Sequence, residues 1–282
     1  MTIDKKMFAE FLAVHPFQPA TALWRAVEVS VVAEHSLPSG RGLDLGCGDG
    51  KLTSILLART GPRELVGVDL DPLETTQAKQ LFFYTNVHTC PGAEIPEPSA
   101  SFDFVFSNSV LEHISPIEPV LAEVARLLKQ GGKFIFTVPS TGFHQCLRGP
   151  RSAARRKEYL EETDARCAHK YYWSESEWAA ALSAVGLEIS ATKAYLHIGE
   201  VRRWESLARS TSGLLFKLYG QKRHPIEIQR RLKLRGNTIG LPKFVARVVA
   251  NLLSLGVKDS LLPQGCLYIE ATKSHSAHAK GT

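Results

Sequence analysis

The stretch GLDLGCGDG, residues 42–50, places glycines at every second position directly after a short apolar run. Glycines at this spacing let a backbone lie hard against a ligand, and the N–H groups of a loop that opens a helix point at that ligand. The dinucleotide-binding motif is G-x-G-x-x-G, and Gly46 and Gly48 fit its first two glycines. Its third glycine would fall at position 51, but this residue is Lys51, and the next glycine in the chain is Gly50. The spacing therefore favours a nucleotide-like ligand other than NAD.

Two acids beside this loop predict the charge of the ligand. Asp44 lies just before the loop, where a carboxylate repels a pyrophosphate and attracts a cation. Asp69 ends the next apolar run, where an acid can accept hydrogen bonds from both hydroxyls of a ribose. The pair indicates a positively charged nucleoside, a description that S-adenosylmethionine meets. An alternative for Asp44, an acid that organises the turn by hydrogen bonding to it, stays open.

The elements that must position these residues follow from the apolar pattern. Short apolar runs alternate with helix-period segments, which predicts an α/β fold with a parallel sheet covered by helices on both faces. Helices are predicted at 21–35, between the fourth and fifth strands up to Gly131, and from a capping box of Ser174 and Glu177. The predicted strands are 41–46, 64–70, 86–90, 102–107, 132–139, 186–196 and 265–273.

Four stretches in register carry a family resemblance: LDLGCGDG, VGVDLDP, FDFVFSNSVLEHI and EVARLLKQGGKFIFTVP. In that order the chain resembles the class I S-adenosylmethionine-dependent methyltransferases, in the small-molecule branch of the ubiquinone and sugar methyltransferases. The resemblance covers about residues 40–140, and YYWSESEWAAALSAVGLEI matches more loosely. It implies a doubly wound, Rossmann-like seven-stranded methyltransferase sheet, S-adenosylmethionine as cofactor and S-adenosylhomocysteine as product.

The resemblance also implies roles for single residues. Asp69 would hold the ribose and Leu70 would pack by the adenine. The residues that would cradle the methionine moiety are Asp44, Gly46, Cys47 and Gly48, and those that would line the cofactor after the fourth strand are Asn108, Ser109 and His113.

The segment after the third strand departs from the family pattern. Many relatives have Gly-Asp-Ala-Glu there, with the Asp near the adenine amino group, whereas this chain has CPGAEIP. Gly92 and Ala93 are expected to offer backbone contacts, and Glu94 is the candidate to replace the missing carboxylate.

Methyl transfer from a sulfonium is an in-line displacement, so an enzyme mainly positions the nucleophile and excludes water. A base is needed only for a protonated oxygen or nitrogen nucleophile. The candidates are His144, shortly after the fifth strand, and His113. The alternative for His144 is a loop histidine without a catalytic role. The alternative for His113 is a side chain that lines the cofactor. No metal is expected, because no cysteine or histidine grouping has zinc spacing.

The positive charge of the chain is concentrated. The net charge is +6, and thirteen Lys or Arg face four acids between residues 199 and 262. The predicted organisation is an N-terminal helical cap (1–39), a cofactor-binding core (40–198), a basic amphipathic helical insertion or lid between strands six and seven (199–262), and a last strand with a tail (263–282). The insertion either packs on the sheet edge or rests on an anionic bilayer. Its predicted apolar faces are Trp204, Leu207, Thr211, Leu214 and Leu218, then Phe244, Val248, Leu252 and Leu255.

These observations predict methyl transfer to an oxygen or nitrogen of a small-molecule, glycan or lipid-linked acceptor. A nucleic-acid methyltransferase is disfavoured, since neither a Pro-Pro-aromatic motif nor a Pro-Cys nucleophile follows the fourth strand. A non-catalytic S-adenosylmethionine-binding protein is the other alternative. Scattered cysteines and an N-terminus without a signal-peptide pattern predict a cytoplasmic protein, with contact at the inner face of a membrane through 199–262 as a variant. The oligomeric state is open.

Overall fold

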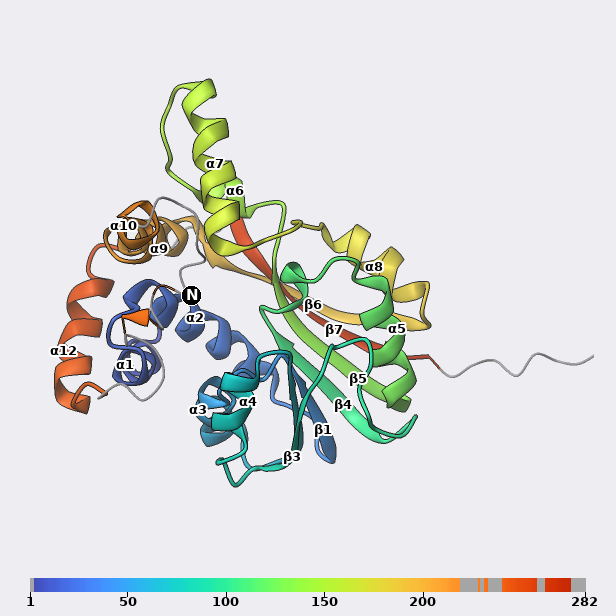
Figure 1. The fold of residues 1–282 in the computed structure, drawn as a ribbon. Helices are drawn as coiled ribbons and strands as arrows, with labels where there is room; N and C mark the ends of the chain where they lie inside the picture. Colours follow the sequence, from blue (N-terminus) through green and yellow to red (C-terminus); the bar gives the residue numbers. More distant parts are fainter. Residues whose placement is uncertain (1–2, 219–227, 229–230, 233–239, 258–261, 275–282) are drawn as a thin grey trace, which may run out of the picture. The chain divides into compact units, whose positions relative to one another are not determined.

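The computed structural model describes residues 3–218, 228, 231–232, 240–257 and 262–274 (Figure 1). Its contacts define two compact units. Unit 1 comprises residues 1–31, 141–170 and 195–266, and unit 2 comprises 32–140, 171–194 and 267–282. Three elements contribute residues to both units: α2 (Pro19–His35), β6 (Leu187–His197) and β7 (Gln264–Lys273).

The sheet has seven strands in the order β3-β2-β1-β4-β5-β7-β6. Strands β1 to β5 pair in parallel. Strand β7 runs antiparallel to β6, because Ser274 donates to Gly186 O (3.1 Å) while the Ser190 hydroxyl donates to Glu270 O (3.2 Å). This sheet confirms the predicted fold class. The first five strands are β1 (Arg41–Leu45), β2 (Glu64–Asp69), β3 (Tyr84–Thr89), β4 (Phe102–Asn108) and β5 (Leu128–Pro139).

Helices cover both faces of the unit 2 sheet, which explains why its central strands are almost wholly apolar. On one face α5 (Glu118–Leu127) and α8 (Glu175–Ser183) pack with strand residues such as Leu45 and Val68 in a single core around the buried Trp178. On the other side of the sheet lie α3 (Lys51–Thr60) and α4 (Pro72–Ala78) (Figure 1). The predicted capping box of Ser174 and Glu177 is confirmed at the start of α8.

The prediction that Gly131 stops the helix before β5 is wrong. Helix α5 ends at Leu127, and Leu128 already pairs with Phe102 of β4. Gly131 lies inside β5 at φ +73°, where the register between β4 and β5 shifts. The apolar run Leu127-Leu128 suits a helix and a buried strand equally, so the sequence pattern could not mark the boundary.

Unit 1 is helical, and its core contains Trp24 of α2, which meets the rings of Phe143 and Trp204 edge-on at 5.5 and 5.4 Å. Trp24 is buried, so its role is core packing. Besides α2, the described helices of this unit are α1 (Lys5–Val14), α6 (Phe143–Cys146), α7 (Ala153–Cys167), α9 (Ile198–Ser210), α10 (Ser212–Leu218) and α12 (Lys243–Ser254).

One expectation for residues 199–262 needs correction. The predicted single helix through Trp204 and Leu218 is broken at Thr211 (φ −120°, ψ −96°), so α9 and α10 are separate and the face of α9 that is buried carries Val201, Trp204 and Ala208. The second predicted apolar face lies along α12 and is exposed, while the small residues Ala246, Ala250 and Ser254 of this helix are buried. The rest of the predicted insertion, residues 219–227, 229–230, 233–239 and 258–261, lies outside the described residues, so the prediction for it is not tested.

Candidate cofactor site and candidate acceptor residues

The glycine loop follows β1 and opens α3. Gly46, Gly48 and Gly50 all have positive φ, at +79°, +54° and +75°. The N–H groups of Gly46 and Cys47 donate to Val68 O at 2.7 and 2.9 Å, which fixes the loop against β2. A Cβ at Gly46 would lie 2.3 Å from the Val110 side chain, whereas one at Gly48 would meet no described heavy atom within 4 Å. Gly48 is therefore the point where the loop backbone borders open space.

Asp69 holds this loop in place. Its carboxylate accepts hydrogen bonds from the backbone N–H groups of Gly48 and Asp71, both at 2.9 Å. Partial burial raises the pKa of Asp69. Since each carboxylate oxygen accepts more than one hydrogen bond, both retain capacity for the hydroxyls of a ribose beside Gly48.

Asp44 is buried beneath the loop. Its carboxylate accepts hydrogen bonds from the Thr53 hydroxyl of α3 (2.6 Å) and from the Tyr84 hydroxyl of β3. Burial raises the pKa of Asp44 to about 6, and the charge of Asp69 adds to the increase. These contacts tie the end of β1 to α3 and β3 beneath the loop. Sequence reasoning missed Tyr84, because it lies before the predicted third strand at 86–90.

The candidate adenine residues follow the ends of β2 and β3. Leu70 is 70% exposed, which leaves its side chain accessible to a ligand. Cys90 N donates to Asp69 O (3.2 Å), which holds the segment after β3 next to the end of β2. In this segment Gly92 packs near Leu45, Ala93 is half-buried and the side chain of Glu94 is exposed. The structure thus brings the predicted residues to one edge of the sheet.

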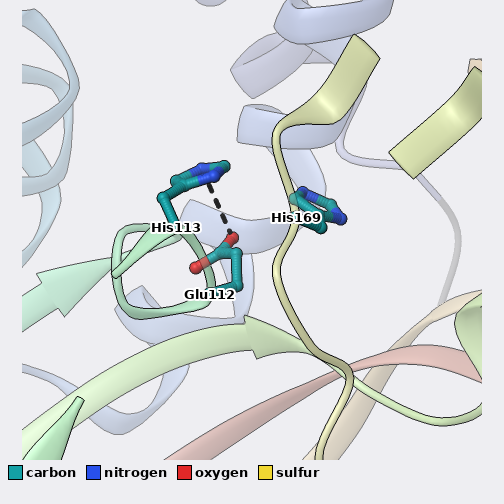
Figure 2. Close-up of side chains that lie close together, drawn as sticks. All are labelled: Glu112, His113 and His169. Atoms are coloured by element: carbon teal, nitrogen blue, oxygen red, sulfur yellow. Dashed lines mark ion pairs between the residues drawn. The ribbon is translucent and has the colours of Figure 1, made fainter. Parts of the chain in front are cut away.

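Asn108, Ser109 and His113 come to the same edge at the end of β4. Ser109 has a positive φ of +49°, and its N–H donates to the backbone oxygen of Thr137 in β5 (3.0 Å). Asn108 is buried. His113 closes the short helix η1 (Leu111–His113), and its Nε2 lies 3.9 Å from Glu112 Oε1 (Figure 2, which also draws His169 of unit 1).

Two aromatic residues near this edge are structural. The Tyr171 hydroxyl donates to Leu111 O (2.6 Å), and the Tyr171 ring stacks on Trp173, 4.7 Å between centroids. Trp173 in turn meets the core residue Trp178 at 4.8 Å. These contacts make the two rings part of the packed connection between η1 and α8.

His144, the other histidine candidate, belongs to unit 1. It lies in α6, and its Nε2 is 2.8 Å from Asp164 Oδ1 of α7. A carboxylate on one ring nitrogen orients an imidazole for proton transfer at the other. Asp164 was missed because nothing in the sequence links a residue of α7 to one of α6.

Comparisons with known proteins agree with this geometry. Residues 43–136 match the family model described as a methyltransferase domain. A dimethylglycine N-methyltransferase of Parasynechococcus marenigrum is 35% identical over 127 residues, which are 43% of this chain and 45% of that protein. A ubiquinone biosynthesis O-methyltransferase of Xanthomonas axonopodis pv. citri is 29% identical over 206 residues, 70% of this chain and 81% of that one.

A solved structure extends the agreement to the fold. The geranyl diphosphate C-methyltransferase of Streptomyces coelicolor, in complex with Mg²⁺, geranyl diphosphate and S-adenosylhomocysteine, has a TM-score of 0.53 and 13% identity, and covers 87% of this chain and 76% of that one.

The fold and the site define a Rossmann-like α/β domain whose glycine loop and two carboxylates suit a cationic nucleoside. With the family match, residues 43–136 belong to the class I S-adenosylmethionine-dependent methyltransferase family, and the cofactor of this family is S-adenosylmethionine. The predicted family and cofactor are confirmed. The chain spans less than half the length of the first curated relatives it matches.

Proposed function

We propose that the whole chain is a methyltransferase that transfers a methyl group from S-adenosylmethionine to an oxygen or nitrogen of a small-molecule, glycan or lipid-linked acceptor. The observation that carries the proposal is the loop at Gly48, open to a ligand and held by Asp69 within a methyltransferase domain. The N- and O-methyltransferases among the relatives support both acceptor atoms.

The cofactor, when bound, supplies a methyl group on a sulfonium that leaves as a neutral thioether. The remaining work falls to the residues of the chain. Asp69 binds the ribose, the loop at Gly46, Cys47 and Gly48 receives the methionine moiety, and Asp44 supplies negative charge beneath it. His144, oriented by Asp164, removes the proton from the acceptor oxygen or nitrogen. Asp164 is a positioning residue in this proposal.

Two measurements test the activity. Calorimetric titration with S-adenosylmethionine, S-adenosylhomocysteine and NAD is expected to show micromolar binding of the first two and no binding of NAD. Mass spectrometry of small-molecule extracts incubated with protein and cofactor then detects an acceptor that gains one methyl group. Binding without any methylated product would favour a non-catalytic S-adenosylmethionine-binding protein.

A matched pair of variants tests the base once an acceptor is known. His144→Gln is expected to lower turnover about 100-fold at neutral pH without changing cofactor affinity, because a positioned base contributes rate rather than cofactor binding. Asp164→Asn should shift the pH profile of turnover. The control is His88→Gln, because His88 in β3 makes the same kind of pair with Glu97 (2.8 Å) outside the site. If His144→Gln keeps the turnover rate and the pH profile of the wild-type protein, His144 is not the base.

A further inference from the structure

Helix α12 and the residue that follows it carry an apolar stripe that faces solvent. Phe244, Val248 and Leu252 recur at helical spacing and are 72%, 56% and 59% exposed, and Leu255, just past the helix end at Ser254, is 60% exposed. Exposed apolar side chains that occur singly are ordinary, but three in one row on a helix with a fourth directly after it mark an interaction surface.

The orientation of α12 is fixed by its other face. Ala246, Ala250 and Ser254 are buried where α12 packs along α1, as Figure 1 shows within unit 1. Leu241 N donates to Ala13 O (3.0 Å), which anchors the segment just before the helix. Turning the stripe inward would force Phe244 and three aliphatic side chains into a contact built for small residues.

The charge around the stripe is positive. Lys243 and Arg247 are exposed on the same helix, and residues 240–257 contain no acid. Two of the four acids in the basic segment 199–262 are buried and satisfied internally. Glu200 accepts from His197 N (2.8 Å), and Glu205 accepts from two backbone N–H groups at 2.8 and 2.9 Å and from the Tyr159 hydroxyl at 2.5 Å. Their carboxylates therefore do not face an external anionic surface.

We propose that this stripe is a docking surface for a bilayer that contains anionic lipids. The four apolar side chains enter the boundary between headgroups and acyl chains, while Lys243 and Arg247 lie against the negative headgroups. The cations beside the stripe favour an anionic lipid surface over a neutral one. The inference does not rest on the proposed methyl transfer, and it would place a lipid-linked acceptor near the enzyme.

Sedimentation with vesicles tests the surface on the full chain. We expect the protein to pellet with phosphatidylcholine vesicles that contain phosphatidylserine at low salt, and to be released at high salt. Phe244→Ser and Leu252→Ser should each weaken the partition about tenfold, because each loses the burial of one large apolar side chain. Lys243→Gln with Arg247→Gln should weaken it about 30-fold.

The matched control is Phe82→Ser, since Phe82 is a fully exposed phenylalanine of unit 2 and its loss should leave vesicle binding unchanged. Several results would overturn the proposal: no pelleting of the wild-type protein at low salt, equal pelleting with pure phosphatidylcholine, or unchanged pelleting of Phe244→Ser. Sedimentation velocity tests whether a second copy of the chain, rather than a bilayer, covers the stripe. A dimer that Phe244→Ser converts to monomer, without vesicle binding, would reassign the stripe to contact between copies of the chain.

Discussion

At the scale of single residues, Asp44 makes folding stability depend on pH. Burial raises its pKa from 3.8 to about 6, so the folded protein binds more protons than the unfolded chain between these values. Stability that is present below pH 4 is therefore lost as pH rises towards 6, by up to about 3 kcal/mol. Urea unfolding of the wild type and of Asp44→Asn from pH 4 to 7 measures this. The free energy of unfolding of the wild type should fall relative to that of Asp44→Asn as pH rises. Parallel pH profiles would contradict it.

Asp69 makes a second residue-level prediction. Asp69→Ala should weaken binding of both S-adenosylmethionine and S-adenosylhomocysteine by about 1.5 to 3 kcal/mol, as expected for lost charge-assisted hydrogen bonds to the ribose. Calorimetric titration measures the loss. Asp71→Ala is the control, because Asp71 caps α4 through Leu73 N (2.9 Å) and has no proposed ligand contact. Unchanged affinity in Asp69→Ala would remove the ribose assignment.

At the scale of elements, the capping box that opens α8 carries a measurable share of stability. The Ser174 hydroxyl accepts from Glu177 N while the Glu177 carboxylate accepts from Ser174 N (2.7 Å). Ser174→Ala should lower the free energy of unfolding by about 1 kcal/mol, since a backbone donor of the first turn loses its partner. Chemical denaturation checks the value against Ser206→Ala in the interior of α9, which should lose none. Equal effects in the two variants would refute a capping contribution.

The elements also show where sequence reasoning ends. Apolar runs and glycine loops predicted all seven strands and the edge at which Gly48, Asp69 and Asn108 meet, because parallel strands deliver their carboxyl ends to one edge. Periodicity predicted an apolar face on α12 but not whether that face is buried or exposed. In the structure the small residues Ala246 and Ala250 are buried in the close contact with α1. Partners far apart in sequence, such as Tyr84 with Asp44, depend on the tertiary fold.

At the scale of the whole molecule, shared elements link the two units. Helix α2 and strands β6 and β7 each contribute residues to both, so opening the sheet of unit 2 breaks elements of unit 1. Saturating S-adenosylmethionine stabilises the folded state by about 2.7 kcal/mol at a hundredfold excess over Kd. Hydrogen exchange should therefore slow in α9 of unit 1 as much as in α5 of unit 2. Slowing confined to α5 would mean that the units open separately.

Among the described residues, no helix is long and apolar enough to cross a membrane.

The position of β7 has a consequence for synthesis on the ribosome. This strand lies between β5 and β6 in the sheet, yet residues 264–273 are translated after both neighbours. Until they emerge, β6 has no strand beside it and one edge of β5 is unpaired. After β6 is complete this lasts about 4 to 15 seconds at elongation rates of about 5 to 20 residues per second. A nascent chain stalled before residue 264 should therefore depend on chaperones, and the same chain should lose that dependence once Lys273 has left the exit tunnel.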